Sequence, residues 1–406
     1  MRRALLAALL LSGAPARALE WVPIGGIGAL GGLHTFDGSR GSFTGNLDAT
    51  FAPALRLSDS WAALPSARAE FEGTRRLADV LGTATPVQQR AEGRVGVRGV
   101  YGDPSSRWRL KPGISYDAEL LKETKDEDWG RGLFDHQRLT VGGEVELLTD
   151  EPHSARFGAD WFKVLYPNYT TLESMAAYQF RGQSLSRELV GEHALDREGY
   201  QFSLAGDGAL GPRAVWEGRT AVVWSTFPNQ RIVDEGGQLT SDNREDVFVD
   251  ASLALRMPHE WNADRRALAG FELGLTANSS NQNGYDATRG RFQPGFYDFT
   301  EWRAVPSATL ILGPVRRPVR VTATLGWKRR EYPHRSPQDS GGADRGGALV
   351  STEWTGGLSL SYPMTKRLSL AFELDRASAS SNQDFQPFYR YSYQATTALA
   401  GVRWDW

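Results

Sequence analysis

Histidine is the first residue type to examine for catalysis or metal binding, because imidazole titrates near neutral pH and is a common metal ligand. The chain contains His34, His136, His153, His193, His259 and His334. No two of them are four residues apart, which is the spacing of the helical zinc motif. Cysteine is absent, so thiolate ligands and disulfides are unavailable. The sequence therefore predicts no metal centre.

Two further groups of residues have the types needed for chemistry. Asp135 and His136 are adjacent, but neighbours on a strand point to opposite faces, so adjacency alone does not make an acid–base pair. A triad of this pair with one of the many serines stays open. The run Asp126-Glu127-Asp128 offers the oxygens that Ca²⁺ prefers, yet no further ligands are evident and a solvated loop explains it. Without a nucleophile elbow or a Walker motif, we expect neither enzyme activity nor a cofactor.

The pattern that dominates the chain is alternation of apolar and polar residues with period two, which indicates strands with one apolar face. In the segment 247–257, Leu253 and Leu255 fall on one face and Asp250 falls on the other. We predict sixteen such strands, many of them longer than the roughly 9–11 residues that a tilted strand needs to cross a membrane. Their ranges are 24–35, 44–57, 60–74, 91–102, 105–121, 131–149, 153–166, 197–208, 211–226, 245–257, 266–280, 297–312, 318–333, 347–362, 366–380 and 389–406.

Short and long connections alternate between these strands. The short ones carry the Pro, Gly, Asp and Ser that tight turns need, and they lie at 58–60, 103–105, 150–152, 210–212, 258–265, 313–318 and 362–365. The long polar ones lie at 75–90, 122–130, 167–196, 227–244, 281–296, 334–346 and 381–388. This layout is typical of outer-membrane barrels, whose short turns are periplasmic. If 167–196 crosses the membrane twice, the strand count becomes eighteen.

The start of the chain has the features of an export signal. Arg2 and Arg3 precede an apolar run at 4–11, and Ala16-Arg17-Ala18 is a small-x-small cleavage site. An uncleaved anchor is the alternative, but the run is too short to span a bilayer as a helix. We therefore predict a signal peptide at 1–18 and a single domain at 19–406.

The chain ends with Gly401-Val402-Arg403-Trp404-Asp405-Trp406. This end resembles the closing strand of Gram-negative outer-membrane β-barrels, in which a glycine and a terminal aromatic residue are read by the barrel-insertion machinery. The resemblance implies an all-β fold, namely a transmembrane, antiparallel, up-and-down β-barrel. It also implies Gly401, Trp404 and Trp406 as the assembly signal, and outer-membrane lipid and the barrel-assembly machinery as partners. The even strand number and the short periplasmic turns place both termini in the periplasm. We expect no plug domain, because the first predicted strand starts within a few residues of the predicted cleavage site.

In such a barrel the apolar faces contact lipid and the polar faces line the interior, because a charge in hydrocarbon is costly. The charged residues predicted to line the lumen carry both signs. They are Arg94, Arg98, Arg109, Lys111, Asp117, Glu119, Glu144, Glu146, Glu217, Arg219, Asp250, Arg256, Glu272, Arg303, Arg320, Glu353, Glu373 and Asp375, with Asp48 beside them. Most are explained as cross-strand pairs that only stabilise the barrel. The others are candidates for a solute pathway.

A barrel of this width keeps a water-filled lumen, which predicts a conduit for a hydrophilic polymer or solute. The net charge of −2 argues against a nucleic-acid partner. The overall plan, together with Tyr166-Pro167-Asn168-Tyr169 and Ser380-Ser381-Asn382-Gln383, resembles the barrels of poly-N-acetylglucosamine exporters. That resemblance implies exopolysaccharide as the cargo and a separate periplasmic export protein as a partner. The alternatives are a general diffusion porin, although no arginine ladder is recognisable, a surface receptor or adhesin, and an outer-membrane enzyme.

Overall fold

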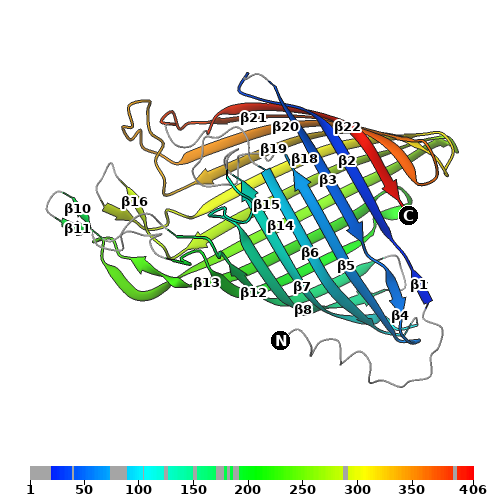
Figure 1. The fold of residues 1–406 in the computed structure, drawn as a ribbon, viewed down its shortest axis with the longest axis horizontal. Coiled ribbons are helices and arrows are strands. Elements are labelled where there is room, and N and C mark those ends of the chain that lie inside the picture. Colours follow the sequence, from blue (N-terminus) through cyan, green and yellow to red (C-terminus); the bar gives the residue numbers. More distant parts are fainter. Residues whose placement is uncertain are drawn as a thin grey trace.

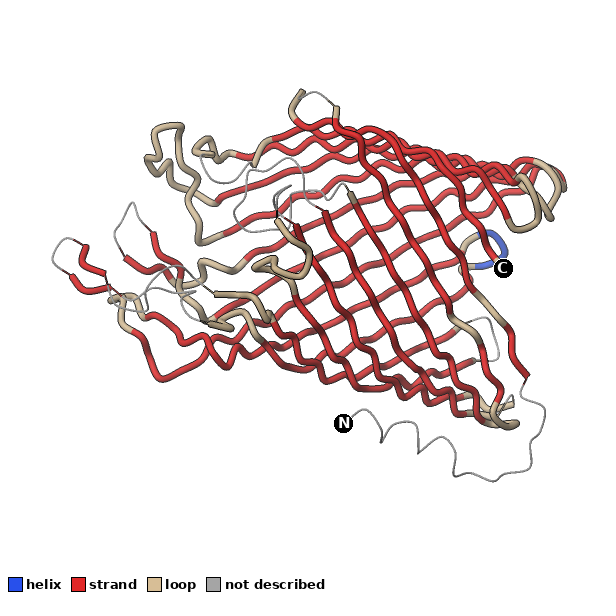
Figure 2. Tube along the Cα trace, viewed as in Figure 1, coloured by secondary structure: helices blue, strands red, loops and turns tan. Residues whose placement is uncertain are grey.

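Sixteen long antiparallel strands close into one barrel (Figures 1 and 2). In chain order they are β2 (Gly25–Phe36), β3 (Ser42–Phe51), β5 (Trp61–Glu72), β6 (Gln89–Tyr101), β7 (Trp108–Lys122), β8 (His136–Leu148), β9 (Ser154–Leu165), β12 (Arg197–Ala209), β13 (Val215–Val233), β14 (Leu239–Asn262), β15 (Arg265–Ser280), β18 (Phe299–Leu312), β19 (Val319–Tyr332), β20 (Leu349–Pro363), β21 (Leu368–Ser381) and β22 (Tyr393–Asp405). The predicted all-β barrel and its strand number are confirmed.

The computed structural model describes residues 20–38, 41–73, 89–103, 105–122, 127–149, 153–170, 178–180, 183–185, 192–286, 291–386 and 391–406. The predicted signal peptide, residue 126 of the acidic run and most of the loop 75–90 lie outside this part of the chain. The described residues form no separate plug domain. Within them, no helix is long or apolar enough to cross a membrane.

Six short strands and one 3₁₀ turn complete the described structure. β1 (Glu20–Val22) and β4 (Ala54–Arg56) pair with each other and extend the barrel sheet. The hairpins β10–β11 (Tyr178–Phe180, Gln183–Leu185) and β16–β17 (Gly284–Asp286, Arg291–Gln293) each form a separate two-stranded sheet, and the turn η2 spans Gly211–Arg213. Because β10 and β11 pair only with each other, the eighteen-strand alternative is not what the barrel contains.

The barrel closes where the last strand meets the first long one. β22 pairs with β2 in a continuous antiparallel register, for example Trp404 with Ile27 and Ala398 with Leu33. Trp406 donates its backbone N–H to the carbonyl of Gly25 at 3.1 Å, and its ring packs 5.1 Å from that of Trp404. The predicted assembly signal therefore lies at this seam, whereas its recognition by another protein stays a prediction.

Several predicted strand ranges differ from the structure, among them the connection 258–265, where β14 continues to Asn262. Two further differences have physical causes. The predicted loop 227–244 is mostly strand, because β13 and β14 continue as a paired ribbon beyond their apolar parts. Backbone pairing does not require apolar side chains, so a polar ribbon looks like a loop in the sequence. The predicted strand 44–57 is interrupted at Ala52 and Pro53, which separate β3 from β4, because proline has no N–H for the ladder.

Side chains alternate between the two faces of the wall, as the sequence predicts. On β14, Leu253 is 47% exposed on the outside, whereas Asp246 on the opposite face is 9% exposed. Exposed outer residues on other strands include Val97, Phe202 and Leu370. A continuous apolar exterior of this extent is stable in lipid rather than in water. A closed antiparallel barrel of even strand number with such an exterior is the architecture of the Gram-negative outer membrane.

The two ends of the barrel differ. β1 and the C-terminus lie at the end that carries the short turns, and the hairpins β10–β11 and β16–β17 project from the opposite end (Figure 1). The predicted alternation of short and long connections is therefore a real difference between the two rims.

Candidate functional site

The barrel encloses a cavity of ≈1130 Å³ whose lining comes mainly from β5 to β18. Seven basic side chains line it, namely Arg94, Arg98, Lys111, Arg138, Arg197, Arg219 and Arg303. Four carboxylates line it as well, namely Glu144, Asp160, Asp246 and Asp250. Basic groups therefore outnumber acidic ones on this wall, although the whole chain is slightly acidic.

All eighteen charged residues predicted to line the lumen lie on interior-facing positions of their strands. Seven of them line the cavity directly: Arg94, Arg98, Lys111, Glu144, Arg219, Asp250 and Arg303. The others share the inner face through period-two alternation, and they are Arg109, Asp117, Glu119, Glu146, Glu217, Arg256, Glu272, Arg320, Glu353, Glu373 and Asp375. Their part in a solute pathway stays a prediction.

Many of these charges are paired across neighbouring strands. Lys111 lies 2.9 Å from Glu144 and 3.0 Å from Glu146, and Arg256 lies 2.8 Å from Glu217. Asp250 binds Arg303 at 2.8 Å. Such pairs hold adjacent strands in register. They support the structural explanation that the sequence offers for most of the charged set.

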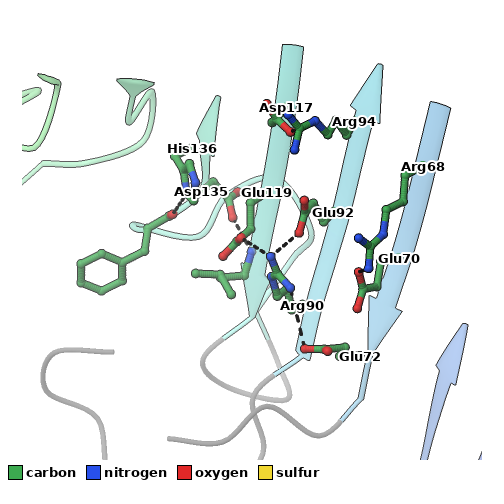
Figure 3. A network of polar contacts seen from close by, with 12 residues as sticks. Arg68, Glu70, Glu72, Arg90, Glu92, Arg94, Asp117, Glu119, Asp135 and His136 are labelled. Carbon is green, nitrogen blue, oxygen red and sulfur yellow. Dashed lines mark hydrogen bonds and ion pairs between the residues drawn. The ribbon is translucent and has the colours of Figure 1, made fainter. Parts of the chain in front are cut away.

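Figure 3 shows a second paired cluster on the inner wall of β5, β6 and β7. Arg90 forms ion pairs with Glu92, with Glu119 at 2.8 Å and with Glu72 at 3.9 Å. In the same view Arg94 binds Asp117 at 3.1 Å. Carboxylates outnumber cations around Arg90, so this part of the wall does not attract an anion.

Three cavity arginines differ from the rest. Arg98 on β6, Arg138 on β8 and Arg197 on β12 form no ion pair with any residue that the structure describes. Arg98 is among the residues predicted from the sequence to line the lumen, whereas Arg138 and Arg197 are not. Arg138 has the same parity as Glu144 on its strand, so the alternation alone was a sufficient signal for it.

Carboxylates gather on the wall that faces these arginines. Glu373 on β21 interacts electrostatically with Asp375 and with Asp48 on β3. Arg403 lies 3.6 Å from Asp48 and offsets part of this charge. β21 is halfway around the barrel from β9, because equal numbers of strand steps separate them in the two directions. The lumen is therefore more basic on one side and more acidic on the other.

No hydrogen bond or ion pair joins Asp135 to His136. The Asp135 carboxylate accepts hydrogen bonds from the backbone N–H of Leu121 at 2.7 Å and of Gly132 at 3.1 Å. Burial raises the pKa of the Asp135 carboxyl, and these two N–H donors oppose the shift without cancelling it. The His136 ring packs 5.3 Å from that of Tyr166. Asp135 is thus a structural residue that fixes the loop before β8, which explains why that strand starts at His136 and not at 131.

Replacing Asp135 with alanine is expected to release this loop. The substitution leaves two backbone N–H groups without their acceptor, at a cost of about 1–3 kcal/mol. Amide hydrogen exchange at Leu121 and Gly132 should accelerate by a factor of roughly 5–150, the equivalent of that free energy. The matched control is Asp128→Ala in the same loop, because Asp128 is exposed and has only an exposed ion pair with Arg131. Unchanged exchange in Asp135→Ala would show that the carboxylate does not hold the loop.

Metal binding finds no support in the described residues. No three histidine, aspartate or glutamate side chains among them are arranged to hold an ion. The absence of a cofactor and of enzyme activity stays a prediction from the sequence.

Comparison with known proteins identifies structural neighbours only. No family model matches the chain, and neither does any curated protein. A loop-deletion form of OmpT, an outer membrane protein of Vibrio cholerae, is similar with 10% identity, a TM-score of 0.42, and coverage of 96% of this chain and 100% of that one. A bacterial polysaccharide outer membrane secretin has 9% identity, a TM-score of 0.44, and coverage of 95% and 98%. The outer membrane protein opdK from Pseudomonas aeruginosa has 12% identity, a TM-score of 0.38, and coverage of 95% and 99%. These identities are too low for residues or functions to be transferred, and the neighbours are, like this chain, outer-membrane β-barrels.

Proposed function

We propose that the barrel is a passive conduit for hydrophilic cargo across the outer membrane, with its long loops outside the cell and both termini in the periplasm. The observation that supports this most is the cavity of ≈1130 Å³, which is lined by charged and polar side chains and enclosed by a closed barrel. A polar solute that enters it exchanges hydrogen bonds with water for similar bonds with the wall. The barrel-assembly machinery is the partner that insertion requires.

The cargo that we propose first is an exopolysaccharide. A polymer needs a long polar wall that binds it weakly at every point. The mixed and largely paired charges of the lumen provide such a wall. The resemblance of the whole plan to exopolysaccharide exporters points the same way. A separate periplasmic export protein would then deliver the polymer to the short-turn end.

A diffusion channel for small solutes is the second candidate. It is favoured by the charge difference between the arginine side of the lumen and the Glu373 side. Charge of one sign along a low-dielectric wall selects small ions and solutes by attraction. A surface receptor or adhesin, or an enzyme, is the third candidate, and no arrangement of the described side chains favours it.

The conduit predicts electrical conductance. Folded protein in a planar bilayer is expected to give discrete current steps, because the lumen holds water and mobile ions. Heat-denatured protein is the control and should give none. Absence of steps, both in the full chain and after shortening of the β9–β12 connection, would contradict a conduit of any kind.

Deletion of the gene separates the two kinds of cargo. Loss of a surface polysaccharide while its monomers are still synthesised is the result expected for a polymer exporter. Unchanged surface sugar, with slower uptake of small solutes, would favour the diffusion channel.

A further inference from the structure

Two arginines that form no ion pair with any described residue flank strand β9 on the inner wall. Arg138 of β8 and Arg197 of β12 both pair in register with Val164, one from each side. Strands in a sheet lie about 4.8 Å apart, so the two Cα atoms are roughly 10 Å apart. Side chains as long as arginine reach across such a gap, so both guanidinium groups can contact one small ligand above β9.

The position of Arg138 is fixed by neutral contacts. Its guanidinium lies over the ring of Phe162, 4.7 Å from the centroid. Its Nε donates to Thr140 Oγ1 at 3.2 Å and one Nη donates to Gln201 Oε1 at 3.4 Å. A guanidinium has five N–H donors, so most of those on Arg138 are left for a ligand. The Nε of Arg197 is buried and has no hydrogen-bond partner.

The charges around Arg138 do not neutralise the site. Arg197 and Arg94 repel Arg138, and Asp117 and Asp160 attract it. Asp117 is bound to Arg94, which leaves Asp160 as the carboxylate that faces Arg98 and Arg138. Three arginines against one carboxylate leave a positive site in a partly desolvated wall. An anion would relieve the repulsion through charge-assisted hydrogen bonds.

Space for a ligand comes from a glycine beside Arg98. Gly113 of β7 pairs in register with Gly142 of β8. On the neighbouring strands, Arg98 of β6 pairs with Gly113 and Asp160 of β9 pairs with Gly142. The Asp160 carboxylate lies over Gly142, where a Cβ would come 2.1 Å from Oδ1. The space over Gly142 is therefore filled by Asp160, whereas a Cβ at Gly113 would meet only ordinary contacts at 3.5–3.9 Å, so Gly113 leaves room in the cavity that it lines.

We propose that Arg98, Arg138 and Arg197 form a binding site for the carboxylate or phosphate group of an acidic hydrophilic solute or polymer unit in the lumen. Gln201 and Ser203, which also line the cavity, are placed to bind neutral hydroxyl groups of the same molecule. This inference rests on the proposed conduit and adds that its cargo is negatively charged.

Ion selectivity of the wild-type channel is the first test. Under a KCl gradient, the reversal potential is expected to show a preference for chloride, because seven basic side chains and four carboxylates line the cavity. A channel that conducts but prefers potassium would overturn the anion site and leave the conduit intact. This measurement needs no variant, so misfolding cannot obscure it.

Block of the current by defined solutes is the second test. Glucuronate and glucose 6-phosphate should each reduce the current in the wild type, whereas neutral glucose should not. In Arg138→Gln/Arg197→Gln the blocking concentration is expected to rise roughly tenfold or more, since each charged hydrogen bond contributes about 1.5–3 kcal/mol. Which of the two acids blocks at the lower concentration tells whether the site prefers carboxylate or phosphate.

The matched control is Arg266→Gln. Arg266 lies on the inner face near the short-turn end of β15, outside the cavity lining, and it has no ion pair with a described residue. Its loss changes the lumen charge without touching the site, so block should be unchanged. Equal weakening in the control and in the site variants, or equal block by glucose and the acids, would refute the binding site. Heat-modifiable migration on gels verifies that every variant is folded.

Discussion

Arginine at position 253 is expected to stop the barrel from assembling. Leu253 is 47% exposed on the outer face near the middle of β14, where it contacts acyl chains. A charge at the bilayer midplane of a barrel costs about 2–4 kcal/mol. Leu253→Arg should therefore abolish the folded, heat-modifiable form in outer-membrane fractions, which gel electrophoresis with and without heating measures.

The neighbouring position provides the control. Ala254 faces the lumen and pairs in register with Glu217 on one side and Glu272 on the other. An arginine there enters water beside two carboxylates, so Ala254→Arg should assemble normally. If the two variants behaved alike, the assignment of the outer face to lipid would be wrong.

Closure of the barrel should be equally sensitive to a side chain at Gly401. A Cβ at this position would lie 1.9 Å from the carbonyl oxygen of Ala29 and 2.8 Å from its carbonyl carbon. Both atoms belong to the backbone of β2, which cannot move away without breaking the seam with β22. Gly401→Val is therefore expected to prevent closure and to leave an unpaired strand edge, with loss of the heat-modifiable band.

Gly356 on β20 is the matched control for Gly401, because no atom lies within 4 Å of a Cβ at that position. Gly356→Val should assemble like the wild type. Normal assembly of Gly401→Val would mean that the seam tolerates displacement. In that case the importance of Gly401 would depend on its recognition during insertion and not on packing.

The strands and their faces could be predicted from the sequence because both depend on local alternation. Leu253 and Asp250 differ in parity, and parity alone assigns one to lipid and the other to the lumen. The polar ribbon at 227–244 could not be found in this way, because its pairing involves the backbone and leaves no apolar trace. Pro53 indicates the break after β3, because proline cannot donate to the ladder. The alternation of apolar and polar residues on both sides of Pro53 nevertheless looks like one continuous strand.

The candidate site could be predicted only in part, because it depends on register between distant strands. Lys111 and Arg98 look alike in the sequence as interior cations. Lys111 pairs in register with Glu144, whereas Arg98 pairs with Leu64 and Gly113. Arg138 and Arg197 both pair in register with Val164 of β9, although a long connection separates β9 from β12 in the sequence. Register of this kind is set by the closed sheet as a whole, so sequence patterns did not reveal which cations are left without carboxylates.

The length of β13 and β14 gives the mouth of the barrel an oblique shape. β14 has 24 residues and β13 has 19, whereas β2, nearly opposite, has 12. At about 3.3 Å per residue, β14 extends for roughly 80 Å, far more than a tilted crossing of the hydrocarbon requires. The residues of β13 and β14 beyond the length of such a crossing form a paired polar ribbon that raises one side of the rim, whereas the rim is lower at β2 and β3. If the barrel is the conduit that we propose, we expect large molecules to approach or leave the opening over the β2–β3 side and not along the barrel axis.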